Sequence, residues 1–157
     1  MPKEIQISGL LQERLINLEL KGRNKKEIIE ELVDLIAATG KLKNKKAFLK
    51  SILEREKLGS TGIGNGVAIP HAKSKVVRDF VLVFARKDSG IDFGALDGER
   101  TYLFFSLASP EDEVGVHLKV LSEVARLIKD KFIVDNLKNA KTKKDIIKTL
   151  SFYNHAR

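Results

Sequence analysis

Residues 59–72 read GSTGIGNGVAIPHA, a glycine-rich loop that leads into a short apolar segment, a proline and a histidine. Pro70 has no N–H and a fixed φ, so we expect it to end the strand pairing and to point the chain out of a sheet. His71 would then be presented at the strand exit, with only the small Ala72 behind it. An imidazole with so little bulk around it predicts a site that meets a large partner.

Two helices are predicted upstream of this loop. Asn24 and Glu27 form a helix N-cap and capping-box pair, and Gly40 supplies a C-terminal stop. The second helix is expected to begin near Asn44 and to end in the charged segment 54–57. Apolar residues recur at helical spacing in both. Those expected to face the core are Ile28, Ile29, Leu32, Val33, Leu35, Ile36, Phe48, Leu49, Ile52 and Leu53.

Two segments after the loop have the pattern of buried strands. Residues 80–85 (FVLVFA) and 102–108 (YLFFSLA) are almost wholly apolar, which is typical of strands covered by helices on both faces. A shorter strand is expected at 67–69, and a turn-rich loop at 91–98. Residues 10–20 alternate loosely and are expected to form an opening strand or a loop. The sequence therefore predicts an α/β domain with helices on both faces of a central sheet.

Three helices are predicted after the second buried strand, which 109–110 (SP) should end. A long helix has His117 near its beginning, a short helix covers 132–137, and Thr142 with Asp145 resembles the cap of the last helix. The apolar face of the long helix is expected to include His117, Leu118, Leu121, Val124, Ala125 and Ile128. The inward face of the last helix is expected to include Ile146, Ile147 and Leu150.

The composition is that of a soluble protein. The 157 residues are 43% hydrophobic and 32% charged, which suits one domain over 1–157. No apolar run could span a bilayer and 1–4 begin no signal peptide, so we expect a cytoplasmic protein without membrane insertion. The lack of cysteine excludes disulfides and thiolate chemistry. The net charge of +8 raises nucleic-acid binding as an alternative, but the lysines are scattered without interleaved aromatic residues, so no nucleic-acid partner is expected.

Histidine carries the candidate chemistry. A neutral imidazole, with an unperturbed pKa of about 6.5, is a good nucleophile near pH 7, and attack of His71 on phosphorus would give a phosphohistidine suited to onward transfer. His117 either shields the core or donates a ring N–H to phosphoryl oxygens. Arg55 is either a helix-end cation or a guanidinium that stabilises phosphoryl charge. The loop amides are expected to supply further donors. His155, in the tail, is expected to be a surface residue.

Other chemistries fit the sequence poorly. The glycine loop lacks the Gly-Lys-Ser/Thr ending of a P-loop and leads into a strand rather than a helix. No serine lies in a Gly-x-Ser-x-Gly elbow. A two-histidine metal site at His71 and His117 is an alternative, but no carboxylate stands at a recognised ligand spacing. No cofactor and no metal is therefore expected.

Several segments together resemble one known family. The chain is similar to the enzyme IIA domains of the mannitol/fructose class of the bacterial phosphoenolpyruvate-dependent sugar phosphotransferase system, over roughly residues 10–150. The wording of the glycine loop looks closest to the fructose and nitrogen-regulatory types. The segments that carry the resemblance are 52–56 (ILERE), 59–71, 93–98 (FGALDG), 103–108 and 117–118 (HL). The resemblance implies one IIA domain with a three-layer α/β/α sandwich around a mixed sheet.

The resemblance also implies roles for individual residues. His71 would accept a phosphoryl group from the phosphohistidine carrier protein HPr or its nitrogen-branch relative. His117 would bind that group, and Arg55 would help to stabilise it. The acceptor would be a IIB component in sugar uptake; alternatively, phosphorylation would switch binding to a regulatory target, with no transport role. Ala72 departs from the family, which usually has glycine there.

Overall fold

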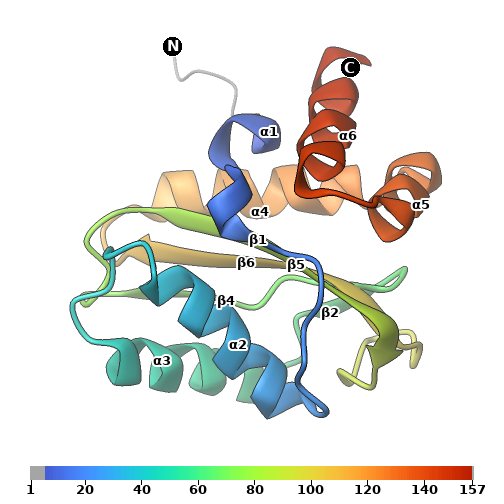
Figure 1. Ribbon diagram of the computed structural model, residues 1–157. Coiled ribbons are helices and arrows are strands. Elements are labelled where there is room, and N and C mark those ends of the chain that lie inside the picture. The colour runs from blue at the N-terminus through green and yellow to red at the C-terminus, as the bar shows by residue number, and fades with distance from the viewer. Residues whose placement is uncertain (1–5, 157) are drawn as a thin grey trace.

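The computed structural model describes residues 6–156 and arranges them in three layers (Figure 1). A six-stranded sheet lies between α2 and α3 on one face and α1, α4, α5 and α6 on the other, so the predicted α/β/α sandwich is confirmed. The helices are α1 (Ile7–Leu10), α2 (Lys25–Ala37), α3 (Lys45–Lys57), α4 (Val114–Leu127), α5 (Lys131–Asn139) and α6 (Lys143–Ala156). The strands are β1 (Ile16–Asn17), β2 (Gly62–Gly64), β3 (Val67–Ala68), β4 (His71–Ser74), β5 (Val81–Ile91) and β6 (Thr101–Pro110).

The sheet is mixed, as predicted. Its strand order is β1-β5-β6-β3-β2, and β4 also pairs with β6. The central strands β5 and β6 are antiparallel, whereas β1 runs parallel to β5 and both β3 and β4 run parallel to β6. The two apolar segments lie in these central strands, and 81–85 and 103–108 are buried throughout. Helices on both faces explain why neither segment alternates with polar residues.

Pro70 does not turn the chain out of the sheet, so that expectation was wrong. Both β3 and β4 lie along β6, with Ala68 opposite Phe104 and His71 opposite Leu107. The physical reason is that proline lacks only a donor. The Pro70 carbonyl accepts two hydrogen bonds from β6, one from the Leu107 amide at 3.0 Å and one from the Ser106 hydroxyl at 2.8 Å. Pairing is therefore interrupted at the proline and resumes at His71.

Side-chain caps fix the helix starts that the sequence indicated. Asn24 Oδ1 accepts from the Glu27 amide at 2.9 Å, and Asn44 Oδ1 accepts from the Ala47 amide at 3.0 Å. At α6, Thr142 Oγ1 accepts from the Asp145 amide at 3.1 Å. These caps fix the first residues of α2, α3 and α6.

Three local expectations need correction. β5 continues past Ala85 to Ile91, so the turn-rich loop begins later than predicted. Residues 10–20 contain the expected opening strand only as the short β1, which follows the end of α1 and a 3₁₀ helix (Glu13–Leu15). Leu118 is 58% exposed, because the buried face of α4 is centred on His117 and Val120 rather than on Leu118. That face comprises His117, Val120, Val124 and Leu127.

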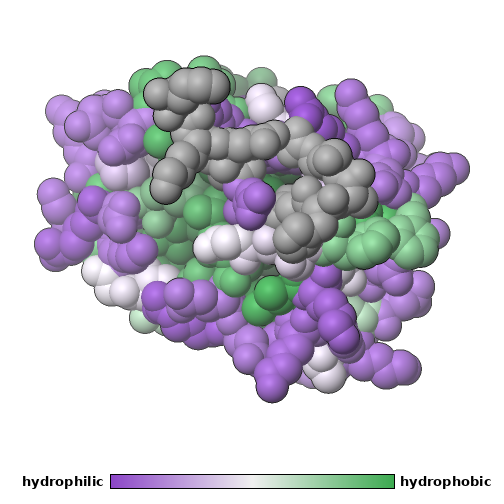
Figure 2. All heavy atoms as spheres, turned by 90° about the horizontal axis from the view of Figure 1, so that it is seen from above, coloured by the Kyte–Doolittle hydropathy of each residue, from purple (hydrophilic) through white to green (hydrophobic). Residues whose placement is uncertain are grey.

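The surface matches the charged composition. Seen from above, hydrophilic side chains cover much of the molecule and hydrophobic ones gather in separate patches (Figure 2). Within residues 6–156, no helix has both the length and the apolar character that crossing a bilayer requires. The expectation about residues 1–4 lies outside the described residues.

Candidate functional site

His71 stands at the first position of β4 with its ring partly exposed. Its Nδ1 lies 2.6 Å from the carbonyl oxygen of Ile69. A carbonyl only accepts hydrogen bonds, so Nδ1 carries the proton in the neutral ring. Nε2 is therefore left with a lone pair, which is the form that a nucleophile needs.

His117 faces this ring from the first turn of α4. The two ring centroids are 5.3 Å apart and the ring planes are inclined by 59°. His117 is 4% exposed, and its Nδ1 lies 2.8 Å from Ser109 Oγ. When the serine hydroxyl donates to Nδ1, the proton of His117 is on Nε2, where it can be donated to a ligand. The structure thus brings together the two histidines singled out in the sequence.

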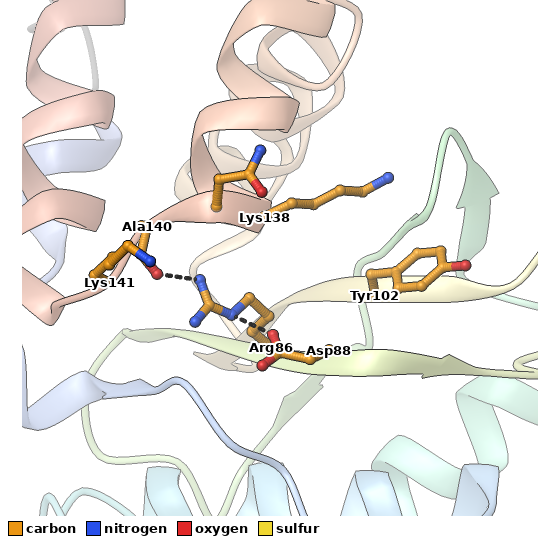
Figure 3. A pocket seen from close by; sticks show the side chains of 7 residues that line it. Arg86, Asp88, Tyr102, Lys138, Ala140 and Lys141 are labelled. Atoms are coloured by element: carbon orange, nitrogen blue, oxygen red, sulfur yellow. Dashed lines mark hydrogen bonds and ion pairs between the residues drawn. The ribbon is translucent and has the colours of Figure 1, made fainter.

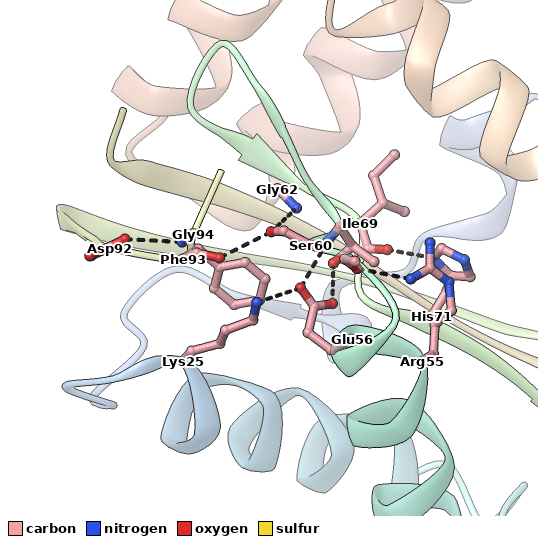
Figure 4. Close-up of polar contacts among 12 residues, drawn as sticks. Lys25, Arg55, Glu56, Ser60, Gly62, Ile69, His71, Asp92, Phe93 and Gly94 are labelled. Atoms are coloured by element: carbon pink, nitrogen blue, oxygen red, sulfur yellow. Dashed lines mark hydrogen bonds and ion pairs between the residues drawn. The ribbon is translucent and has the colours of Figure 1, made fainter. Parts of the chain in front are cut away.

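Arg55 reaches the same site from the last turn of α3. Its Nη1 donates a hydrogen bond to the Gly59 carbonyl over 2.9 Å, and its guanidinium lies beside His71 (Figure 4). The charge of Arg55 also lowers the pKa of His71. Arg55 therefore binds a carbonyl just beyond the helix end and adds positive charge near the imidazole, while its role toward a phosphoryl group stays a prediction.

Both imidazoles are held in their neutral forms at neutral pH. Burial is the main cause that lowers the pKa of His71, and the positive charges of Arg55 and Lys73 lower it further. The pKa of His117 falls from 6.5 to about 4, mainly through burial and then through the charges of His71 and Lys73. A site with two neutral imidazoles offers both a nucleophile and a hydrogen-bond donor near pH 7.

Lys73 and Ser109 belong to this site and were missed by the sequence reasoning. Lys73 follows His71 by two residues in β4, so both side chains project from the same face of the strand. Ser109 lies opposite Lys73 on β6 and is fully buried. The only sequence signal for Ser109 was a polar residue at the end of an apolar strand, and that signal does not identify its partner.

A pH-dependent stability follows from the lowered pKa of His117. As the pH falls below 6.5, the unfolded chain binds a proton at this residue while the folded chain does not, so folding becomes less favourable down to about pH 4. We expect His117 to remove about 3 kcal/mol of stability over this range. Urea denaturation of the wild type and His117→Gln at several pH values measures it; equal slopes of stability against pH would contradict the assignment.

The glycine loop is fixed by a buried carboxylate. Glu56 is 7% exposed, and its carboxylate accepts from the Thr61 amide at 2.8 Å and from the Thr61 hydroxyl at 2.6 Å. Lys25 Nζ of α2 forms an ion pair with it at 2.8 Å (Figure 4). The Ile69 amide in turn donates to the Thr61 carbonyl at 2.9 Å. A continuous set of contacts therefore runs from α2 to the carbonyl that orients His71.

Three of the loop amides that were expected to supply donors to the site are used within the fold. The Thr61 amide binds Glu56, the Gly62 amide donates to Ser60 Oγ at 3.0 Å, and the Asn65 amide donates to Asp97 Oδ2 at 3.2 Å. An amide that already has an acceptor inside the loop is not free for a phosphoryl group. These three amides therefore help to hold the loop in place.

Among the described residues, no three histidine, cysteine, aspartate or glutamate side chains are grouped so that they could hold a metal ion. The only described non-glycine residue with a positive φ is Asn65, at 57°. Ala72 therefore does not have a positive φ and occupies its position without backbone strain. The side chain of His155 lies outside the described part of α6.

The comparisons with known proteins agree on one family. The profile described as "Phosphoenolpyruvate-dependent sugar phosphotransferase system, EIIA 2" matches residues 9–153. The chain therefore belongs to this EIIA family.

Curated relatives fall into two groups. The chain is 38% identical to a "Nitrogen regulatory protein" of Bradyrhizobium diazoefficiens, over 92% of this chain and 94% of that protein. It is 36% identical to the "PTS system fructose-specific EIIABC component" of Bacillus subtilis, over 91% of this chain but 22% of that longer protein. A fructose-specific EIIA component of Haloferax volcanii is 35% identical, over 89% and 91% of the two chains.

Solved structures share the fold. The nitrogen regulatory protein IIA-Ntr from Neisseria meningitidis superposes with a TM-score of 0.85 at 33% identity, over 92% of this chain and 98% of that one. The Escherichia coli mannitol IIA, solved in complex with phosphorylated IIB, gives a TM-score of 0.79 at 22% identity, over 90% and 97%. At that identity, the mannitol structure supports the fold alone.

Proposed function

We propose that this protein is a phosphocarrier and that His71 Nε2 accepts a phosphoryl group from a phosphohistidine of HPr or a related carrier. The observation that carries the proposal is the bond of Nδ1 to the Ile69 carbonyl, which leaves Nε2 unprotonated and beside His117. In the transfer, the P–N bond to the donor ring breaks and a P–Nε2 bond forms. Nδ1 keeps its proton, so the ring becomes cationic, and the Ile69 carbonyl stabilises that charge.

The surrounding residues supply charge for the phosphoryl oxygens in this proposal. His117 donates from Nε2 while Ser109 holds its Nδ1, and Arg55 and Lys73 add positive charge. Transfer of a phosphoryl group depends mainly on such positioning and electrostatic stabilisation, and these protein groups provide both.

The variants Arg55→Gln and Lys73→Gln are expected to slow phosphorylation to different degrees. Because Arg55 lies beside the ring, its replacement should lower the rate of phosphorylation by about tenfold to a hundredfold. Because Lys73 is exposed, its replacement should lower that rate by about threefold to tenfold, and by less at high salt, where its charge is screened. Time courses of labelling, quenched at set intervals, measure both rates. The matched control is Lys75→Gln, which removes an exposed lysine two residues further along; an equal loss in this control would contradict a specific role for Lys73.

The face around His117 is suited to a protein partner. Val114, Val116 and Leu118 are exposed large apolar residues in the first turns of α4, and Leu118 and Val114 are 58% and 43% exposed. Because a carrier must bring its own histidine to His71, we propose that this apolar rim receives it. The same face would then present the phosphoryl group to a IIB component in sugar uptake.

A regulatory role is the second candidate. The nitrogen regulatory relative matches nearly the full length of this chain at an identity similar to that of the fructose relative. In this alternative, phosphorylated and unphosphorylated His71 present different charges to a target protein, with no sugar transport. We further propose that residues 1–157 act as one IIA unit in the cytoplasm.

Phosphorylation of the purified protein tests the proposal. Phosphoenolpyruvate with enzyme I and HPr, or with their nitrogen-branch relatives, should label one acid-labile site. Phosphorus NMR and mass spectrometry should identify it as the Nε2 isomer at His71. Onward transfer to a fructose-type IIB domain would favour the transport role, and its absence the regulatory one. Labelling elsewhere, or on Nδ1, would contradict the site assignment.

A further inference from the structure

A pocket lies away from the histidines, between the connection of α5 to α6 and the strands β5 and β6 (Figure 3). Its volume is about 580 Å³, within the usual range for small-molecule sites. Tyr102 in its wall and Leu107 opposite His71 are five residues apart on β6, which corresponds to roughly 17 Å. The lining residues are Arg86, Asp88, Tyr102, Lys138, Asn139, Ala140 and Lys141.

Arg86 forms the base of this pocket and is unusual for its position. It directly follows the apolar run of β5, and its side chain is 9% exposed. Nη1 donates to the carbonyls of Leu137 at 3.0 Å and Ala140 at 2.6 Å, which secures the end of α5. Nε lies 2.9 Å from Asp88 Oδ1 but makes no hydrogen bond to any described residue. The Nε of a buried guanidinium is therefore paired with one exposed carboxylate that is not held in hydrogen-bond geometry.

Tyr102 gives the pocket a rigid wall. Its ring lies between Gly66 and Gly90, both with positive φ. A Cβ on Gly90 would be 2.5 Å from Tyr102 Cε1, and one on Gly66 would be 3.2 Å from Cδ2, so larger residues would displace the ring. Lys138 Nζ lies over this ring, 4.7 Å from its centroid. The ammonium thus contacts the ring that forms the pocket wall.

The charges decide which ligand the pocket would take. Arg86, Lys138 and Lys141 are cations, and Asp88, 68% exposed on its side chain, is the carboxylate that opposes them. Lys138 and Lys141 lie on opposite sides of the Arg86 guanidinium (Figure 3). Several cations around one buried donor suit a multiply charged anion, and guanidinium and ammonium groups are the usual protein partners of phosphate.

We propose that this pocket is a binding site for a small phosphorylated metabolite, separate from the phosphoryl-transfer site. A phosphate oxygen accepts from Arg86 Nε after the exposed Asp88 carboxylate has moved aside, and Lys138 and Lys141 neutralise the remaining charge. The rest of the ligand lies along Tyr102. The site does not require the proposed phosphocarrier function, because none of its residues takes part in the phosphoryl transfer at His71.

Titration of the ¹⁵N-labelled full-length protein tests this site. The probes are inorganic phosphate, pyrophosphate and adenosine monophosphate, added at constant ionic strength. At least one should bind saturably below about 5 mM and should shift the Arg86 Nε–H and Tyr102 amide resonances. The double variant Lys138→Gln/Lys141→Gln should weaken this binding by at least about tenfold.

The double variant Lys129→Gln/Lys148→Gln is the matched control, because it removes two exposed lysines that do not line the pocket. It should change the affinity by less than about twofold. Lack of saturable binding by all three probes would overturn the proposal. So would equal weakening in both double variants, which would indicate diffuse charge, or shifts confined to residues around His71.

Discussion

Replacement of His71 by alanine is expected to abolish phosphorylation by phosphoenolpyruvate and the upstream carrier proteins. The loss should be at least about a thousandfold, because the variant lacks the atom that forms the bond to phosphorus. His117 cannot substitute for it, since that ring is 4% exposed and its Nδ1 is engaged with Ser109. The effect is measured as the amount of radiolabel on the protein that is lost on acid treatment.

The fold should survive this substitution. The His71 ring is partly exposed, and the one polar contact that alanine removes is the bond to the Ile69 carbonyl, worth about 1 kcal/mol. An amide NMR spectrum and a urea denaturation curve close to those of the wild type would establish that the loss is chemical. If a well-folded His71→Ala protein still became labelled, another residue would be the acceptor and the proposed mechanism would be wrong.

The approach of Arg55, His71 and His117 could be predicted through the resemblance of the whole motif, but not from the spacing of the three residues. They come from α3, β4 and α4, and they meet because β4 pairs with β6, after which the chain enters α4. The buried strands were predictable from local composition, because helices on both faces require continuous apolar runs.

Features that depend on distant partners were not predictable in this way. Pro70 was expected to end the strand, because a local rule cannot include the hydrogen bonds that its carbonyl accepts from β6. Glu56 lies in a charged helix end that indicates solvent exposure, yet the residue is buried, because Lys25 and Thr61 satisfy its carboxylate. Lys73 and Ser109 became recognisable only once the register of β4 and β6 was known.

Replacement of Glu56 by alanine is expected to destabilise the protein by about 3 kcal/mol and to slow phosphorylation of His71. The buried Thr61 amide and hydroxyl lose their acceptor, whereas Lys25, whose side chain is 33% exposed, can be rehydrated. The effect on activity has a structural path, because the Thr61 carbonyl accepts from the Ile69 amide and the Ile69 carbonyl holds Nδ1 of His71. Urea denaturation and the initial rate of labelling measure the two effects.

Two further variants separate the causes. Glu56→Gln keeps an oxygen for the Thr61 amide and a polar group for its hydroxyl but loses the charge that pairs with Lys25, so it should cost about 1 kcal/mol. Glu54→Ala removes an exposed neighbouring carboxylate and should change neither stability nor rate. If Glu56→Ala unfolded with the wild-type midpoint, the carboxylate would not fix the loop. If it unfolded at a lower urea concentration than the wild type but was labelled at the wild-type rate, the orientation of His71 would not depend on the contacts through Thr61 and Ile69.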